Sequence, residues 1–157
     1  MLMKFLVSLF SIFSFCIIAT AQSNSYEDVV SEINKSCKTQ TATFSREAFA
    51  LLTYFNIEMK EEFKTLINDI DQMIVLMPMQ NNNAFYGVAL DVLSKSDYKN
   101  VDISTHTNVN VKVYVAQHLT SLTEVHAVSA RGVMVSFFGK FKYRDIKKLL
   151  KSAEEKL

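Results

Sequence analysis

Apolar residues recur with helical spacing in the first half of the chain, beginning just after a short polar stretch. Ser25 and Asp28 stand three residues apart, the spacing of a capping box at a helix start. An acidic residue in the first turn also suits the partial positive charge at a helix N-terminus. The pattern predicts a helix over 26–37 with one buried face, formed by Val29, Val30, Ile33 and Cys37.

Over residues 39–77 the spacing of apolar residues changes several times, which predicts a succession of short elements. The β-branched stretch 39–44 predicts a short strand. Apolar residues at helical spacing predict helical segments over 48–55 and 63–70. The unbroken apolar run Met73–Met77, closed by Pro78, is too short for a helix of its own. It predicts a strand buried on both faces, and we expect it near the centre of the sheet.

A further helix follows this strand. The asparagines at 81–83 are residues that favour the N-cap position. After them, one helical face is apolar and is formed by Phe85, Ala89, Val92 and Leu93. A helix between a buried strand and further strands predicts a βαβ-like entry into the sheet.

The second half of the chain alternates apolar and polar residues. Four such stretches lie over 101–105, 109–117, 122–129 and 133–137, separated by short turn-forming sequences. They predict an antiparallel meander, and the closing segment 143–157 predicts an amphipathic helix. The predicted fold is α+β: a single, mainly antiparallel sheet with helices packed on one face. The sheet combines the buried strand near 72–77 with a four-stranded meander over 98–141.

The first residues predict a cleavable secretory signal peptide. Lys4 precedes an uncharged apolar run over 5–18, and an A-x-A site places cleavage between Ala21 and Gln22. Two alternatives stay open. The run is shorter than the ~20 residues of a membrane-spanning helix, which disfavours an uncleaved anchor. Phe15 before Cys16 disfavours a lipoprotein signal, which has a small residue there. We expect residues 22–157 to form one soluble domain, periplasmic or extracellular, without a lipid anchor or a stable membrane span.

Charge and cysteine content narrow the classes of partner. Lys4 is the only charged residue of the signal, so its removal balances the 17 basic and 16 acidic residues of the whole chain. A neutral domain has no overall field that draws it to nucleic acid. Cys37 is then the remaining cysteine, which excludes an intramolecular disulfide. We interpret it as a small buried hydrophobe, with an intermolecular bridge as the alternative.

Several short signatures occur in a familiar order. They are the exported start, the strand Met73–Met77, the helix with Phe85, Ala89 and Leu93, Tyr98, and two stretches near the end, Ser136–Phe141 and Asp145–Leu149. Together they resemble the domain-of-unknown-function family numbered 4252, small exported proteins of Bacteroidota. The resemblance is best over 63–150 and implies a fold, without an activity or catalytic residues. The Thr/Asn-rich stretch 105–110 departs from the charged turn expected there.

Three residues near a predicted turn are the best candidates for chemistry. His118 and His126 flank the turn at 120–121, with Glu124 close by, so a hairpin would bring them within a few residues of one another. Such a group suits metal ligation or acid–base catalysis. Histidines on the surface of a meander are the simpler interpretation, and we expect no catalytic site, no metal and no cofactor.

A basic cluster near the end of the chain is a candidate surface for anionic partners. Aromatic residues are interleaved with its six cationic residues: Lys140, Lys142, Arg144, Lys147, Lys148 and Lys151. It suits lipid headgroups, polyanionic glycans or an acidic protein, although a solvated helix face has the same composition.

The sequence leaves three functions of the chain open. A non-enzymatic envelope binding or protein-interaction module, with an unknown protein partner, is favoured over a self-assembling structural or adhesive component. An enzyme with a site near His118, Glu124 and His126 comes third.

Overall fold

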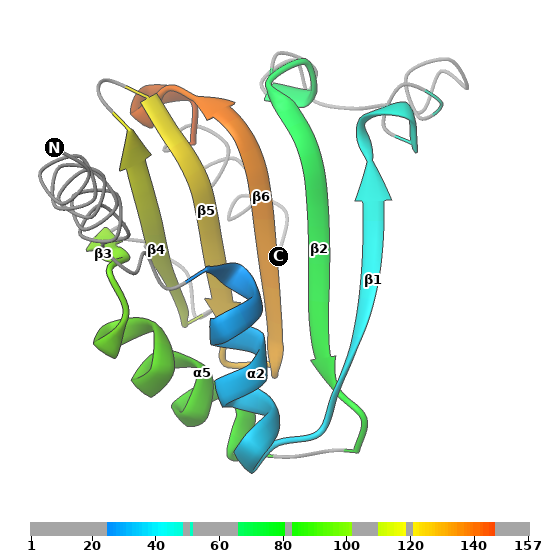
Figure 1. Ribbon diagram of the computed structural model, residues 1–157, viewed down its shortest axis with the longest axis vertical. Coiled ribbons are helices and arrows are strands. Elements are labelled where there is room, and N and C mark those ends of the chain that lie inside the picture. The colour runs from blue at the N-terminus through cyan, green and yellow to red at the C-terminus, as the bar shows by residue number, and fades with distance from the viewer. Residues whose placement is uncertain are drawn as a thin grey trace, which may run out of the picture.

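The computed structural model describes residues 25–48, 51, 66–80, 83–101, 110–118 and 121–146. The predicted signal peptide and its cleavage site at Ala21 and Gln22 lie outside these residues. The longer elements of the described part are two helices and six strands (Figure 1): α2 (Tyr26–Ser36), β1 (Thr39–Ser45), β2 (Ile70–Pro78), α5 (Phe85–Lys95), β3 (Lys99–Val101), β4 (Val111–His118), β5 (Ser121–Ser129) and β6 (Val133–Phe141).

The six strands form one antiparallel sheet in the order β1-β2-β6-β5-β4-β3. The α+β class and the meander from β3 to β6 are therefore confirmed. The meander runs from Lys99 to Phe141, within the predicted range 98–141. Gly132 has φ +84° in the turn between β5 and β6, a left-handed conformation that glycine adopts without steric strain.

The position of β2 differs from the prediction. It lies second from the edge, between β1 and β6, rather than at the centre of the sheet. Ile70 and Leu76 are buried, whereas the run between them is half-buried or exposed. The helix α5 then connects β2 to β3 at the far side of the sheet, with three strands between them. Because every neighbouring pair from β2 to β3 is antiparallel, these two strands run in the same direction. The predicted βαβ-like entry is therefore present, although the two strands that α5 joins are not neighbours.

The predicted N-terminal cap is present at one of the two helices. Ser25 and Asp28 form the predicted capping box at the start of α2. At α5, by contrast, the N-cap residue is Ala84, whose own side chain cannot cap the helix. Capping by the preceding asparagines is therefore wrong for Asn83, and the other two lie outside the described residues.

The sheet has an apolar core on each face. The helices α2 and α5 lie side by side over one face, as Figure 1 shows, and bury Ile33, Phe85 and Leu93 against it. The opposite face carries a second cluster around Val113, Val125 and Phe141, to which Leu66, Ile67 and Ile146 contribute. Residues 66–67 and 143–146 are helical. The helix predicted over 63–70 is too long, because residues 68–69 form a turn and β2 begins at Ile70. Most of the segments predicted over 48–55 and 143–157 lies outside the described residues.

The two edge strands of the sheet differ in their protection. β3 is three residues long and contains Lys99. β1 is seven residues long, contains no charged residue, glycine or proline, and is largely exposed. It is fixed at both ends, since Asn34 Oδ1 accepts hydrogen bonds from the backbone and hydroxyl of Thr39, and Arg46 pairs with Asp71 on β2. An uncharged edge of this length offers backbone groups for pairing with another strand.

Candidate functional site

Three neighbouring strands bring polar side chains together beneath α2 and α5. His126 on β5 lies opposite Tyr114 on β4 and Ser136 on β6. Its neighbour on the same face, two residues earlier, is Glu124. The side chains of His126 and Ser136 are fully buried (0% exposed), so their polar atoms must find partners inside the protein.

His126 is held by one hydrogen bond and three aromatic rings. Its Nδ1 lies 2.9 Å from the hydroxyl oxygen of Ser136. Tyr26 stacks on the imidazole at 5.9 Å between ring centroids, while Tyr98 and Phe138 approach it edge-on at 4.4 and 6.0 Å. This packing leaves the ring a single orientation, with Nε2 directed toward Glu124.

Glu124 is the polar centre of the cluster. Its Oε2 accepts a 2.7 Å hydrogen bond from the Tyr98 hydroxyl. Nε2 of His126 lies 3.3 Å from the same oxygen, without the alignment of a hydrogen bond. The nearby His126 nitrogen, and to a smaller extent the Tyr98 hydroxyl, lowers the pKa of Glu124 against the opposing effect of its partial burial. Burial, assisted by the bond to Glu124, raises the pKa of Tyr98. The pair is therefore a carboxylate and a neutral phenol.

The structure separates the three residues that the sequence grouped. Glu124 and His126 lie together, but His118 is exposed at the end of β4, opposite Ser121. Along β4 it is four residues from Tyr114, the partner of His126, or roughly 13 Å at strand spacing. A joint site of all three is therefore wrong, because His118 lies too far along β4 to reach the cluster.

Ser136, His126 and Glu124 superficially resemble a Ser-His-acid triad. In such a triad the carboxylate orients one imidazole nitrogen while the other activates an accessible serine. Here Ser136 and His126 are both buried, with no exposed surface on either residue. The geometry suits a fixed support for Glu124, in which Ser136 orients the ring.

A cavity opens next to this cluster and is called the Glu124 cavity below. Its volume is about 360 Å³. The start of α2, the segment after α5 and the four strands β2, β4, β5 and β6 contribute to its wall. The ten lining residues are Ser25, Tyr26, Glu27, Gln72, Ile74, Asp97, Tyr98, Ala116, Glu124 and Phe138. Every charged residue among them is acidic.

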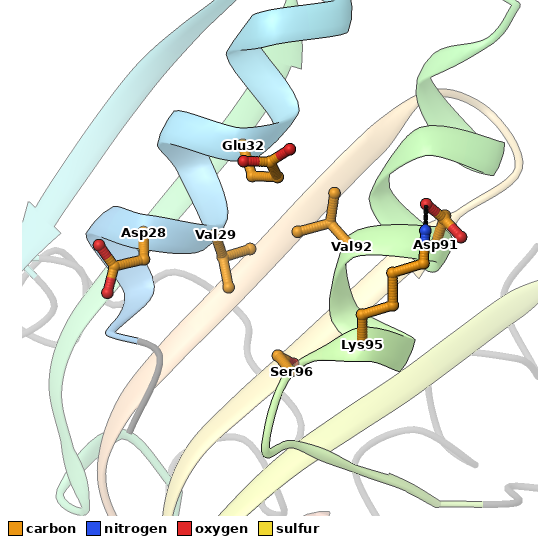
Figure 2. A pocket seen from close by; sticks show the side chains of 7 residues that line it. All are labelled: Asp28, Val29, Glu32, Asp91, Val92, Lys95 and Ser96. Atoms are coloured by element: carbon orange, nitrogen blue, oxygen red, sulfur yellow. Dashed lines mark hydrogen bonds and ion pairs between the residues drawn. The ribbon is translucent and has the colours of Figure 1, made fainter. Parts of the chain in front are cut away.

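A second cavity of about 320 Å³ lies between α2 and α5 (Figure 2). Val29 and Val92 face each other across it. Its charged groups are engaged within their own helices: Asp28 with Ser25, Glu32 with Lys35, and Asp91 with Lys95. The charged groups of this groove are therefore already engaged, each within its own helix.

The basic cluster predicted near the end of the chain is described in part. Lys140, Lys142 and Arg144 are exposed where β6 ends and the next helical turn begins. Arg144 lies 3.6 Å from the carboxylate of Asp145. Lys147, Lys148 and Lys151 lie outside the described residues. The three described cations are thus on the surface, as binding of an anionic partner requires.

Two further observations concern metals and membranes. Within the described ranges, no three His, Cys, Asp or Glu side chains converge as metal ligands would. Nor does any helix there combine the length and the apolar character needed to cross a membrane.

Sequence analysis missed Tyr26, Tyr98 and Ser136 as members of the cluster. The sequence does not place Ser136 opposite His126, because a two-residue turn at 131–132 would put Phe137 there, whereas the turn between β5 and β6 holds three residues, 130–132. No local signal marks the two tyrosines, since α2 and the segment after α5 reach the sheet only through tertiary packing.

Cys37 is buried in the core between the helices and the sheet, which agrees with its interpretation as a small buried hydrophobe.

The chain was also compared with protein-family models, curated proteins and solved structures, and none of them matches it.

Proposed function

We propose that the chain is an exported, non-enzymatic binding module of the cell envelope that contacts a partner protein through the edge strand β1. The single observation that carries this proposal is the uncharged, exposed edge of β1 over Thr39–Ser45. Alternate residues of an edge strand direct backbone N–H and C=O groups away from the sheet. An extended segment of another protein satisfies these groups by adding a strand.

Side chains on β1 support recognition by such a segment. Phe44 is 40% exposed, an unusual exposure for a large apolar residue, and extends the apolar face that Met73 begins on β2. Thr41 and Thr43 line the other face. A partner strand would therefore meet an apolar and a hydroxyl-bearing face, which gives side-chain specificity in addition to main-chain affinity.

Support for export comes from the sequence of residues 1–21, and support for binding over catalysis comes from the polar cluster. A substrate has no access to Ser136 or His126, because both are buried beneath the helices. Glu124 is held by Tyr98 and faces His126, an arrangement that fixes a charge in place.

A self-assembling structural component is the second candidate. The same edge strand favours it, since long edges without charge pair readily with a second copy of themselves. The two candidates differ in the occupant of the edge and are separated by one experiment.

The test places a photo-crosslinking amino acid at Thr43 in cells that export the chain, and at Asn100 on the opposite edge strand as the control. Crosslinked products are identified by mass spectrometry. We expect the probe at position 43, and not that at 100, to react with a different protein. Thr41→Lys places a charge on the same edge and should abolish the product.

Two other results of the crosslinking experiment would contradict this expectation. Crosslinks between two copies, together with a dimer or larger species by light scattering, would support self-assembly instead. Equal products at both positions, or products that persist in Thr41→Lys, would overturn the assignment of β1 as the contact.

A further inference from the structure

We propose that the Glu124 cavity binds a small organic cation, a protonated amine whose ammonium group reaches the carboxylate of Glu124. This site is separate from the β1 edge and does not depend on partner binding there.

The charge of the wall selects a cation. Glu27, Asp97 and Glu124 line the cavity, and none of the described residues of its wall is a lysine, arginine or histidine. Three carboxylates in a recess with apolar walls concentrate a negative potential that attracts positive ligands. The charged residues of the α2–α5 groove, by contrast, include Lys95 and are paired.

The aromatic residues select an organic ligand over a bare ion. Tyr26, Tyr98 and Phe138 all contribute to the wall. Aromatic rings beside carboxylates suit the alkyl part of an amine, and ring faces attract its charged end. The volume of about 360 Å³ lies within the range of cavities that hold small ligands.

The hydrogen-bonding capacity of the wall favours an ammonium group with N–H donors over a quaternary one. Oε2 of Glu124 accepts from Tyr98, while the described residues supply no hydrogen bond to Oε1. The Glu124 side chain is 28% exposed, so a ligand can reach it. The Tyr26 hydroxyl lies against the buried Ser136 and is not itself accessible from the cavity. Oε1 of Glu124 is therefore the oxygen that can accept from an ammonium group.

The cluster behind the wall fixes the acceptor. Ser136 orients His126, and His126 faces Oε2 of Glu124. The carboxylate is thus positioned before a ligand arrives, which reduces the ordering cost of binding.

The experiment titrates the purified, processed protein with n-pentylammonium and follows backbone amide NMR shifts. Pentanol is the neutral control of the same length, and pentyltrimethylammonium is the quaternary control. We expect saturable shifts confined to residues of the Glu124 cavity, with weaker binding of both controls. Glu124→Gln should weaken pentylammonium binding by at least about tenfold, the effect of losing one charge-assisted hydrogen bond.

Two further variants guard against loss of fold. Asp97→Asn changes an exposed acid at the rim and should weaken binding by a few-fold, more so at low salt. Glu32→Gln removes an acid from the α2–α5 groove and should leave the affinity unchanged. Pentylammonium that produces no saturable shift, binds no better than pentanol, or binds Glu124→Gln as well as the original chain would overturn the proposal. These results leave the crosslinking at β1 unaffected, so the two proposals fail independently.

Discussion

Replacement of Gly139 by alanine should destabilise the fold strongly, because the backbone of another segment lies where the new methyl group would be. Gly139 is on β6 opposite Ile70. A Cβ at this position would lie 2.0 Å from the carbonyl oxygen of Asp69 and 3.0 Å from the ring of Phe141. Ordinary contact begins at 3.4 Å, so the two segments must separate by more than about 1 Å.

The magnitude follows from what this separation disrupts. Overpacking a well-filled interior costs about 1–3 kcal/mol. The shift also strains the 3.1 Å hydrogen bond from the Lys140 amide to the Asp69 carbonyl, worth about 0.5–1.5 kcal/mol. We therefore expect Gly139→Ala to lower the free energy of unfolding by about 2–4 kcal/mol.

Equilibrium unfolding in urea measures this change, with Gly87→Ala as the matched control. Gly87 is an exposed residue within α5, and nothing lies within 4 Å of a Cβ built there. Alanine at Gly87 should therefore raise the stability by about 0.5–1 kcal/mol through helix propensity. With a slope of about 1.5 kcal/mol per molar urea, the midpoint of Gly139→Ala should fall by roughly 1.3–2.7 M. An unchanged midpoint would refute the close approach of Asp69 to Gly139, and equal losses in both variants would refute the steric explanation.

Two further predictions concern the polar cluster. Ser136→Ala removes the partner of a buried imidazole nitrogen and should cost about 1–3 kcal/mol; Ser94→Ala, which removes an exposed hydroxyl bonded within α5, should change urea stability little, and equal effects would contradict the role of Ser136. Because the pKa of Glu124 in the fold is below its ordinary value of 4.5, its ionised form stabilises the fold above that pH, and this contribution disappears as pH falls through the lowered value. The stability difference between the original chain and Glu124→Gln should therefore shrink on acidification from about pH 6 to about pH 3, whereas a gap independent of pH would refute it.

The elements of the fold were predictable where local sequence decides them. The capping box at Ser25 and the alternation of β4, β5 and β6 act over a few residues, and these elements form where the pattern predicts. Strand order is set by which apolar faces meet across the whole chain. The run Met73–Met77 consequently suggested a central strand, although only contact with β1 and β6 determines its position.

In the candidate site, too, the sequence predicted contacts between residues close together in the chain but not between distant ones. Glu124 and His126 share a face of one strand, so their proximity follows from strand periodicity. His118 was misplaced because it lies four residues along β4 from Tyr114, the partner of His126, and the sequence between the two strands does not show how far the pairing continues. The extra residue Thr123 on β5 also shifts the register toward the turn, and no local pattern marks it. Tyr26 and Tyr98 join the cluster from segments distant in sequence, which no local pattern predicts.

The pairing of β2 with β6 has a consequence for the order in which the domain folds as the chain is synthesised. Synthesis proceeds from the N-terminus, so β2 is made long before β6. Until β6 appears, β2 lacks the inner neighbour against which Leu76 pairs with Met134, and the core beneath α2 and α5 stays incomplete. The sheet therefore closes late, and the paired strands β1 and β2 stay accessible to chaperones until β6 has been made.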